Sequence, residues 1–429
     1  MAIRKWQGLT PVALLLPILL LGGCRGEPAA PAEPGKVLLI GLDGAEWDLI
    51  RPMAAAGELP NLARLMKTGA SGNLRSLEPA AVSPAIWTTI ATGKSPEAHR
   101  IESFTASKRN QATTGRTRAV RTVWDIASEA GRTVGVVGWL VSWPAEKVNG
   151  FMVTDYIQYV GDTKDWMQGR PDRTYPPALA DEIAPLVVRS DAMPWSAVQR
   201  FLDLPLDVAA LDKDVEGLLM PIKGISAADL SYTQIAAKLY RGRSPDLFAV
   251  YLRGMDGMGH LFWNYMQPEA PGGDQLNAKG MAYLKGTMRA YYRYTDEQVG
   301  RIVALADDRT TIIVVSDHGF KGGPGRGVQL HDLDGVLVMA GHNVKRGEVT
   351  GASVYDLTPT LLVLLGIAPA KDMRGKVLWS ALDPAIPRER YTPVVATYET
   401  GKRPVPGPPP NVPPNDGTME QLKALGYVE

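Results

Sequence analysis

The sequence predicts an α/β fold in which helices cover both faces of a mostly parallel central sheet. Short apolar runs, which are typical of strands buried on both faces, recur along the chain. Segments with helical spacing separate these runs, and strands that alternate with helices favour parallel pairing. The 429 residues, 45% of them hydrophobic, suffice for one large domain with insertions.

The first half of the chain contains two such units. A strand is predicted over 36–42 and ends at Asp43. A helix is expected over 60–66, where the apolar residues share one face. A second helix begins at Val123, stops at a glycine and leads into a strand over 134–138.

The second half repeats the alternation. Strands are predicted over 245–252 and 310–316, and a helix around 288–306 precedes the latter. Residues 155–240 fit this rhythm poorly, because proline, tryptophan and acidic residues are scattered through them without a clear period. We expect this stretch to be an inserted cap region that covers the functional site.

Residues 1–24 are expected to be the signal peptide of a bacterial lipoprotein. A basic start precedes an apolar run over 11–21 that is too short to span a bilayer comfortably. Leu21-Gly22-Gly23-Cys24 looks like a lipobox, and Cys24 is the only cysteine. We therefore expect an exported protein that is lipidated at Cys24 and held on the periplasmic side of the outer membrane. A plain signal peptide or an anchor helix is the alternative.

The segments that flank the predicted domain are rich in proline. Residues 25–35 are expected to be a Pro/Ala-rich tether that holds the domain off the membrane. The folded catalytic domain is expected over 36–395. Residues 396–429 form a Pro-rich tail in which a short helix is predicted over 419–425.

Composition limits the classes of partner. The 46 Lys and Arg residues nearly balance the 45 Asp and Glu residues, so the formal net charge is +1. We expect no binding of a nucleic-acid polymer, because such binding needs a basic face that follows the phosphate backbone. A chain with one cysteine cannot form an internal disulfide.

Six aspartate and histidine side chains follow predicted strands or begin predicted helices. They are Asp43, Asp256, His260, Asp317, His318 and His331. Carboxylate and imidazole groups are ligands suited to zinc. Two zinc ions about 4 Å apart can clamp both the attacking and the leaving oxygen of a phosphoryl transfer, and an open catalytic zinc uses three protein ligands. The six side chains therefore predict a site for two Zn²⁺ ions.

Each of these residues also has a plain structural interpretation. Asp43 could close a turn, and Asp256 and His260 could be polar residues of a surface loop. His99 and His342, the remaining two of the five histidines, are interpreted as structural. The order, spacing and strand-end placement of the six residues together favour the metal site.

Ser83 is the candidate nucleophile. It precedes Pro84 at the start of a helix predicted over 84–92, where serine is a favoured N-cap and proline a favoured first residue. A hydroxyl there faces the N–H groups and the positive end of the helix dipole, which suit an anionic phosphate. A serine hydroxyl needs activation, which metal coordination can supply. Ser83 can therefore both cap the helix and attack phosphorus.

Together these motifs resemble the alkaline phosphatase superfamily, and its type I phosphodiesterase/nucleotide pyrophosphatase branch most closely. The resemblance covers residues from about 36 to 378, and the motifs follow one another in the same order as in that family. It rests on Ile40–Gly44, Ser83-Pro84 with Thr92-Gly93, Pro96 and His99, Asp256 with His260, Ser316–Gly319, His331 and Asp356–Thr360.

The resemblance implies an alkaline phosphatase-like fold and hydrolysis of phosphate monoesters or diesters. It implies that one zinc ion is held by Asp256, His260 and His331. The other would be held by Asp43, Asp317 and His318 together with Ser83, which would form a phosphoserine intermediate. Mn²⁺ is an alternative metal.

The sequence departs from the patterns of two relatives near the nucleophile. Nucleotide pyrophosphatases carry an asparagine three residues after it, where this chain has Ile86. Sulfatases carry an arginine four residues after it, where this chain has Trp87. Sulfatase activity is therefore not expected, and nucleotide pyrophosphatase specificity does not follow. Lys321 or Lys94 could replace the missing phosphate-binding group.

Two other functions compete with hydrolysis. A phosphotransferase on the same scaffold would move a phospho-substituted group to an envelope glycan or lipid. A surface lipoprotein without turnover would bind an envelope component, but a degenerate binder would be expected to lose at least one of the six ligands.

Overall fold

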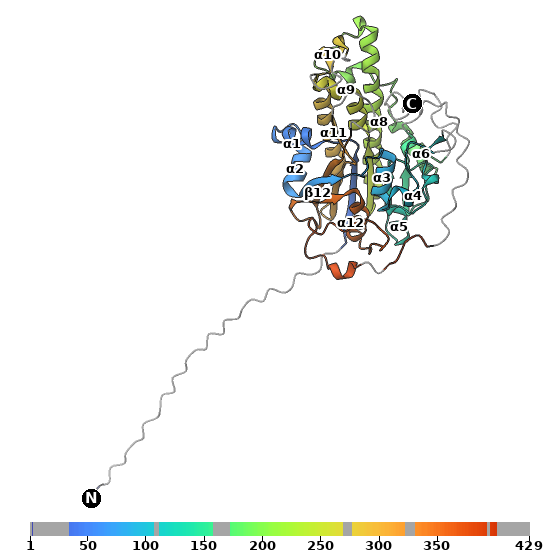
Figure 1. Cartoon of the computed structure of the whole chain (residues 1–429), viewed down its shortest axis with the longest axis vertical. Helices are drawn as coiled ribbons and strands as arrows, with labels where there is room; N and C mark the ends of the chain where they lie inside the picture. Colours follow the sequence, from blue (N-terminus) through green and yellow to red (C-terminus); the bar gives the residue numbers. More distant parts are fainter. Residues whose placement is uncertain are drawn as a thin grey trace.

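The computed structural model describes residues 34–106, 111–157, 172–268, 277–321, 331–392 and 395–400, together with residue 2. Helices lie on both sides of one central sheet (Figure 1). Cys24, most of the predicted tether and the predicted helix over 419–425 lie outside the described residues. Within the described part of the chain, no helix has the length and apolar character needed to cross a membrane.

The described residues form a central sheet of ten strands, with β1 in its interior. β1 pairs in parallel with β8 on one side and with β9 on the other, and β5 and β6 continue the parallel pairing beyond β8. β12 lies antiparallel between β9 and β2, and β7 is antiparallel to β6. The bounds are β1 Lys36–Leu42, β2 Ala70–Arg75, β5 Val134–Val137, β6 Gly150–Val153, β7 Thr174–Tyr175, β8 Leu247–Leu252, β9 Thr310–Val315, β12 Asp334–Gly341, β13 Gly347–Glu348 and β14 Ala352–Ser353.

Helices cover both faces of this sheet because its strands are apolar on both sides. In β1, Leu38, Ile40 and Leu42 belong to one buried cluster, whereas Val37 and Leu39 belong to another. The first cluster contains residues of α1 Trp47–Ala55, α2 Pro60–Thr68, α8 Lys213–Arg243, α9 Gly254–Met266 and α11 Thr287–Val303. The second contains residues of α3 Ser83–Thr92, α5 Val123–Glu129 and α12 Leu357–Leu364. The predicted α/β class is therefore confirmed.

The region 155–240 contains a long helix that its sequence pattern hides. Helix α8 has 31 residues and packs beside α9 and α11 (Figure 1). Its apolar period is weak because it contains Pro221 and buries polar residues such as Ser226, Asp229 and Thr233. Shorter helices in this part of the fold are α6 Leu179–Ile183, α7 Trp195–Val198 and α10 Ala278–Leu284. That the region covers the functional site stays a prediction.

The N-terminus of α2 is capped by a side chain from another helix. Its own N-cap residue, Leu59, provides no side-chain hydrogen bond. The buried carboxylate of Asp296 on α11 accepts the backbone N–H groups of Asn61 at 3.1 Å and Leu62 at 2.8 Å. These bonds satisfy two of the N–H groups that every helix leaves without an internal partner.

We expect Asp296→Ala to lower the free energy of unfolding by about 1–3 kcal/mol, because buried donors lose their acceptor. Denaturant unfolding of the variant measures this change. The metal content should stay that of the wild type, since α2 carries none of the predicted ligands. An unchanged unfolding midpoint would show that the cap contributes nothing.

Candidate active site

The first candidate metal group lies at the carboxyl ends of two neighbouring strands. Asp43 follows β1 directly, and Asp317 and His318 follow β9 after one residue. Because β1 and β9 are parallel neighbours, their ends meet at one edge of the sheet. One ligand atom from each of the three residues lies within 4.8 Å of the others, and all three side chains are buried.

The second candidate group lies beside it, after the other neighbour of β1. Asp256 and His260 are one turn apart on α9, which follows β8. His331 begins β11 His331–Asp332, which pairs with β10 Gly319–Phe320 directly after the first group. The Nε2 atom of His260 lies 3.2 Å, and that of His331 3.5 Å, from Oδ1 of Asp256.

The two groups adjoin each other. The imidazole rings of His318 and His331 stack with their centroids 3.6 Å apart. The Nε2 atom of His318 lies 3.9 Å from Oδ1 of Asp256. All six predicted ligands therefore converge on one buried place, and among the described residues no other cluster of this kind is present.

The hydroxyl of Ser83 faces the first group. Its Oγ atom lies 3.5 Å from Oδ1 of Asp43 and 3.4 Å from Nε2 of His318. Ser83 is the first residue of α3, whereas Val82 is the N-cap residue. The prediction that Ser83 caps the helix is therefore wrong, because its side chain turns toward the carboxylate and the imidazole.

Two donors fix the orientation of the Asp43 carboxylate. The indole N–H of Trp87 donates to Oδ2 at 3.1 Å, and the hydroxyl of Tyr251 donates to the same oxygen. The other carboxylate oxygen, Oδ1, therefore faces Ser83 and His318. Trp87 lies one turn after Ser83 on α3, and its ring is close enough to β1 that only glycine fits at Gly41.

Sequence reasoning missed these roles. From the sequence alone, Trp87 is only a departure from the sulfatase pattern, and Tyr251 is one residue of a predicted strand. The sequence contains two signals for them: Trp87 follows Ser83 at the helical spacing i, i+4, and Tyr251 is a polar aromatic near the end of an otherwise apolar strand.

Further hydrogen bonds tie together the loops that follow β1 and β9. The hydroxyl of Ser316 accepts the N–H of Ala45 at 2.9 Å and donates to the carbonyl of His318 at 2.6 Å. Glu46 accepts the N–H of Phe320 at 2.8 Å. Nδ1 of His318 lies 2.9 Å from the carbonyl oxygen of Gly319, so Nδ1 carries a proton and Nε2 is the atom that faces the carboxylates.

The buried acidic and imidazole groups of the site shift one another's pKa values strongly. Burial and the neighbouring Asp43 carboxylate raise the pKa of Asp317 well above its usual value. Burial lowers the pKa of His318, but the carboxylates of Asp317 and Asp43 outweigh it and raise that pKa to about 10. Burial and His318 lower the pKa of His331 to about 4.

This environment fits divalent cations. Oδ1 of Asp256 and Oδ2 of Asp317 are buried and accept no well-aligned hydrogen bond from the described residues, although imidazole nitrogens lie 3.2 to 3.5 Å from them. A buried carboxylate oxygen is costly unless a donor or a cation satisfies it. Three carboxylates and three imidazoles are a donor set that suits zinc.

The remaining residues noted in the sequence have other partners. Nδ1 of His99 accepts the N–H of Ile101 at 3.1 Å, and its Nε2 lies 3.0 Å from the hydroxyl of Thr89. Burial lowers the pKa of His99 to about 3, so this neutral ring holds the chain against α3. Lys94 pairs with Asp372, and Lys321 with Asp332, each at 2.6 Å.

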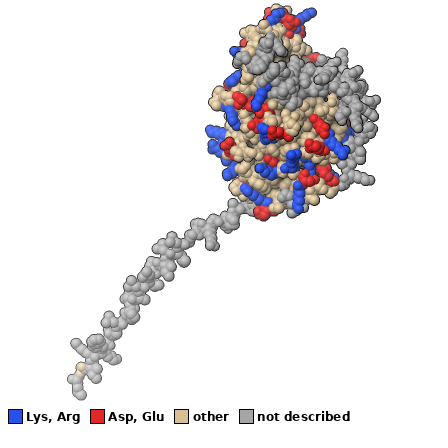
Figure 2. All heavy atoms as spheres, in the orientation of Figure 1, with Lys and Arg blue, Asp and Glu red and all other residues tan. Residues whose placement is uncertain are grey.

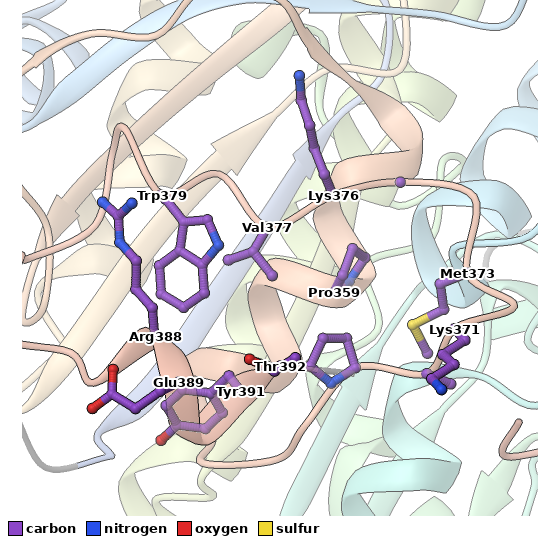
Figure 3. A pocket seen from close by; sticks show the side chains of 13 residues that line it. Pro359, Lys371, Met373, Lys376, Val377, Trp379, Arg388, Glu389, Tyr391 and Thr392 are labelled. Carbon is purple, nitrogen blue, oxygen red and sulfur yellow. The ribbon is translucent and has the colours of Figure 1, made fainter. Parts of the chain in front are cut away.

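The surface adds little to this assignment. Basic and acidic residues are interspersed on the face shown in Figure 2. A pocket of about 560 Å³ lies beside α12, where Trp379, Arg388 and Tyr391 are among the residues that line it (Figure 3). The residues that line this pocket include neither Ser83 nor any of the six predicted ligands, so the pocket is separate from the candidate active site.

Comparison with known proteins identifies a family and related folds. The family model described as type I phosphodiesterase / nucleotide pyrophosphatase matches residues 37–392. The alkaline phosphatase PafA is similar in structure, with a TM-score of 0.55 at 13% identity, over 82% of this chain and 100% of that chain. A 2-O GAG sulfatase has a TM-score of 0.51 at 12% identity, over 81% of this chain and 74% of its own. These likenesses show the fold. No curated protein matches the chain in sequence.

We expect Trp87→Phe to weaken metal binding at the Asp43 group by about 10-fold, the lower end of the usual effect of losing a hydrogen bond to a metal ligand. The phenyl ring keeps most of the packing while the indole N–H is lost. Zinc titration of the purified protein measures the affinity. Trp124→Phe is the matched control, because Trp124 is buried in the same cluster but makes no hydrogen bond to a ligand. Equal affinities in the two variants would contradict the role of the indole.

Metal affinity should rise with pH between about pH 6 and 9. In this range a cation must displace the proton held by His318, whose folded-state pKa is raised to about 10. Each displaced proton makes the affinity rise by about tenfold per pH unit. Calorimetric titration in buffers of different protonation enthalpy counts the released protons. An affinity that does not change with pH would mean that the ligands are already deprotonated.

Proposed function

The chain belongs to the type I phosphodiesterase/nucleotide pyrophosphatase family and is a metal-dependent phosphoester hydrolase, and on this premise we propose that Ser83 is its nucleophile. We further propose that two Zn²⁺ ions are its cofactors and that the reaction passes through a phosphoserine. The observation that carries the proposal is the position of the Ser83 hydroxyl, 3.5 Å from Asp43 and 3.4 Å from His318.

The six ligands divide into two sets of three. Asp43, Asp317 and His318 would hold one cation, and Asp256, His260 and His331 the other. When bound, the cations supply the positive charge that stabilises the phosphoryl oxygens. The convergence of an intact set of six ligands supports an enzyme rather than a surface protein that only binds.

The protein's own residues define the course of the reaction. Oγ of Ser83 forms a bond to phosphorus while the bond from phosphorus to the leaving alcohol breaks, and the alcohol leaves with a proton. The carboxylate oxygen Oδ1 of Asp43 is the acceptor that faces the hydroxyl proton of Ser83. Water then attacks the phosphoserine, phosphate departs and Ser83 regains its proton. The N–H groups of the first turn of α3 favour the anionic phosphoryl group throughout.

Attachment to a membrane is a second part of the proposal. It is supported by the sequence alone, through the lipobox-like residues 21–24 and the single cysteine. We propose that Cys24 carries lipid, that residues 25–35 act as a tether and that the domain over 36–395 works at the periplasmic face of the outer membrane.

Ser83→Ala should lower turnover by about 10³-fold or more, because the phosphoserine can no longer form. The variant should still bind two metal ions. Ser76→Ala is the matched control, since the Ser76 hydroxyl is buried without a hydrogen-bond partner among the described residues. Rates with aryl phosphate monoesters, aryl phosphate diesters and a sulfate ester, on zinc-loaded protein, measure the effect. Wild-type turnover in Ser83→Ala would remove Ser83 from this role.

The same assay separates hydrolysis from transfer. Adding an acceptor alcohol partitions the phosphoryl group between water and the alcohol. Phosphate as the main product supports a hydrolase, whereas a phosphorylated alcohol as the main product would indicate the phosphotransferase.

A further inference from the structure

Helix α9 carries two of the proposed ligands, yet its N-terminus has no cap of its own. Asp256 is its third residue, and His260 lies one turn later. The N-cap residue, Arg253, makes no capping hydrogen bond with its side chain. The first N–H groups of the helix therefore need acceptors from elsewhere in the fold.

Asp229 of α8 supplies such an acceptor. Its side chain is completely buried, and its Oδ1 atom accepts the backbone N–H of Arg253 at 3.1 Å. Its Oδ2 atom accepts the hydroxyl of Tyr291, a buried residue of α11, at 2.9 Å. Burial raises the pKa of Asp229 to about 7, while bonds from Tyr291 and from the N–H groups of Arg253 and Gly254 lower it.

The first residue of α9 is Gly254, and a larger residue would not fit beside Asp229 and Tyr291. A Cβ atom at Gly254 would collide with the hydroxyl of Tyr291 and with Oδ2 of Asp229. Glycine therefore allows the carboxylate to approach the helix end closely. A carboxylate at this end also interacts favourably with the helix dipole. Helices α8, α9 and α11 therefore meet at Gly254, which is two residues before Asp256.

We propose that Asp229 and Tyr291 are positioning residues for the cation held by Asp256, His260 and His331. The inference rests on the proposed function, because it takes these three residues to be metal ligands. A metal site needs its ligand atoms within about 0.5 Å of the required geometry. Releasing the first turn of α9 moves Asp256 and His260 together. Asp43, Asp317 and His318 follow strands β1 and β9, so the other cation site is not affected.

The test is a zinc titration of full-length Tyr291→Phe and Asp229→Asn proteins. We expect one of the two dissociation constants to rise by about 10-fold, the lower end of the effect of losing a direct partner of a metal ligand, because Asp229 and Tyr291 act on the ligands through the helix backbone. The other dissociation constant should stay that of the wild type. Tyr291→Phe removes only the hydroxyl, so the helices keep their packing. Circular dichroism and the melting temperature confirm that each variant is folded.

Two control variants separate positioning from general stability. Tyr294→Phe removes a buried hydroxyl from the same helix, but that hydroxyl donates to the carbonyl of Ser226 rather than to Asp229. Asp296→Asn weakens the corresponding cap of α2, which carries no ligand. Both controls should keep both wild-type metal affinities, even where the melting temperature falls.

A His260→Ala background identifies the affected site. Once that site is disabled, Tyr291→Phe should not change the affinity of the remaining site. Folded Tyr291→Phe and Asp229→Asn proteins with two wild-type affinities, or with both sites weakened equally, would overturn the inference and leave the proposed function intact. A wild-type protein that does not bind two zinc ions would instead overturn the proposed function.

Discussion

The structure depends on one constraint: three carboxylates and three imidazoles are held together in a buried place at the edge of the central sheet. Such groups are costly inside a protein unless cations or hydrogen bonds compensate them. The surrounding residues hold the ligands in place rather than neutralise them. Trp87 and Tyr251 orient Asp43, and Asp229 holds the start of the helix that carries Asp256.

The sheet topology brings the ligands together. β1 lies between β9 and β8, and all three strands run in the same direction. Side chains that follow these strands therefore meet at one edge, although they are far apart in the sequence. Helix α3 then places Ser83 beside Asp43. Its first turn presents the hydroxyl, and its second turn presents the indole that orients the carboxylate.

The α/β class, which the structure confirms, and the six candidate ligands could both be predicted from the sequence because both depend on local patterns. Apolar runs indicate the strands, and aspartate and histidine residues after them indicate the candidate ligands. Helix α8 was not predicted, since the polar residues it buries obscure the helical period. The hydrogen-bond partners of Tyr251, Asp229 and Tyr291 could not be predicted either, because only the packing of distant segments brings each partner near.

The most direct test of the account is anomalous diffraction at the zinc absorption edge from crystals of the zinc-loaded protein. The account predicts two peaks about 4 Å apart. One should be bound by Asp43, Asp317 and His318, and the other by Asp256, His260 and His331, with the Ser83 hydroxyl toward the first. A single peak, or peaks away from these six side chains, would contradict the account.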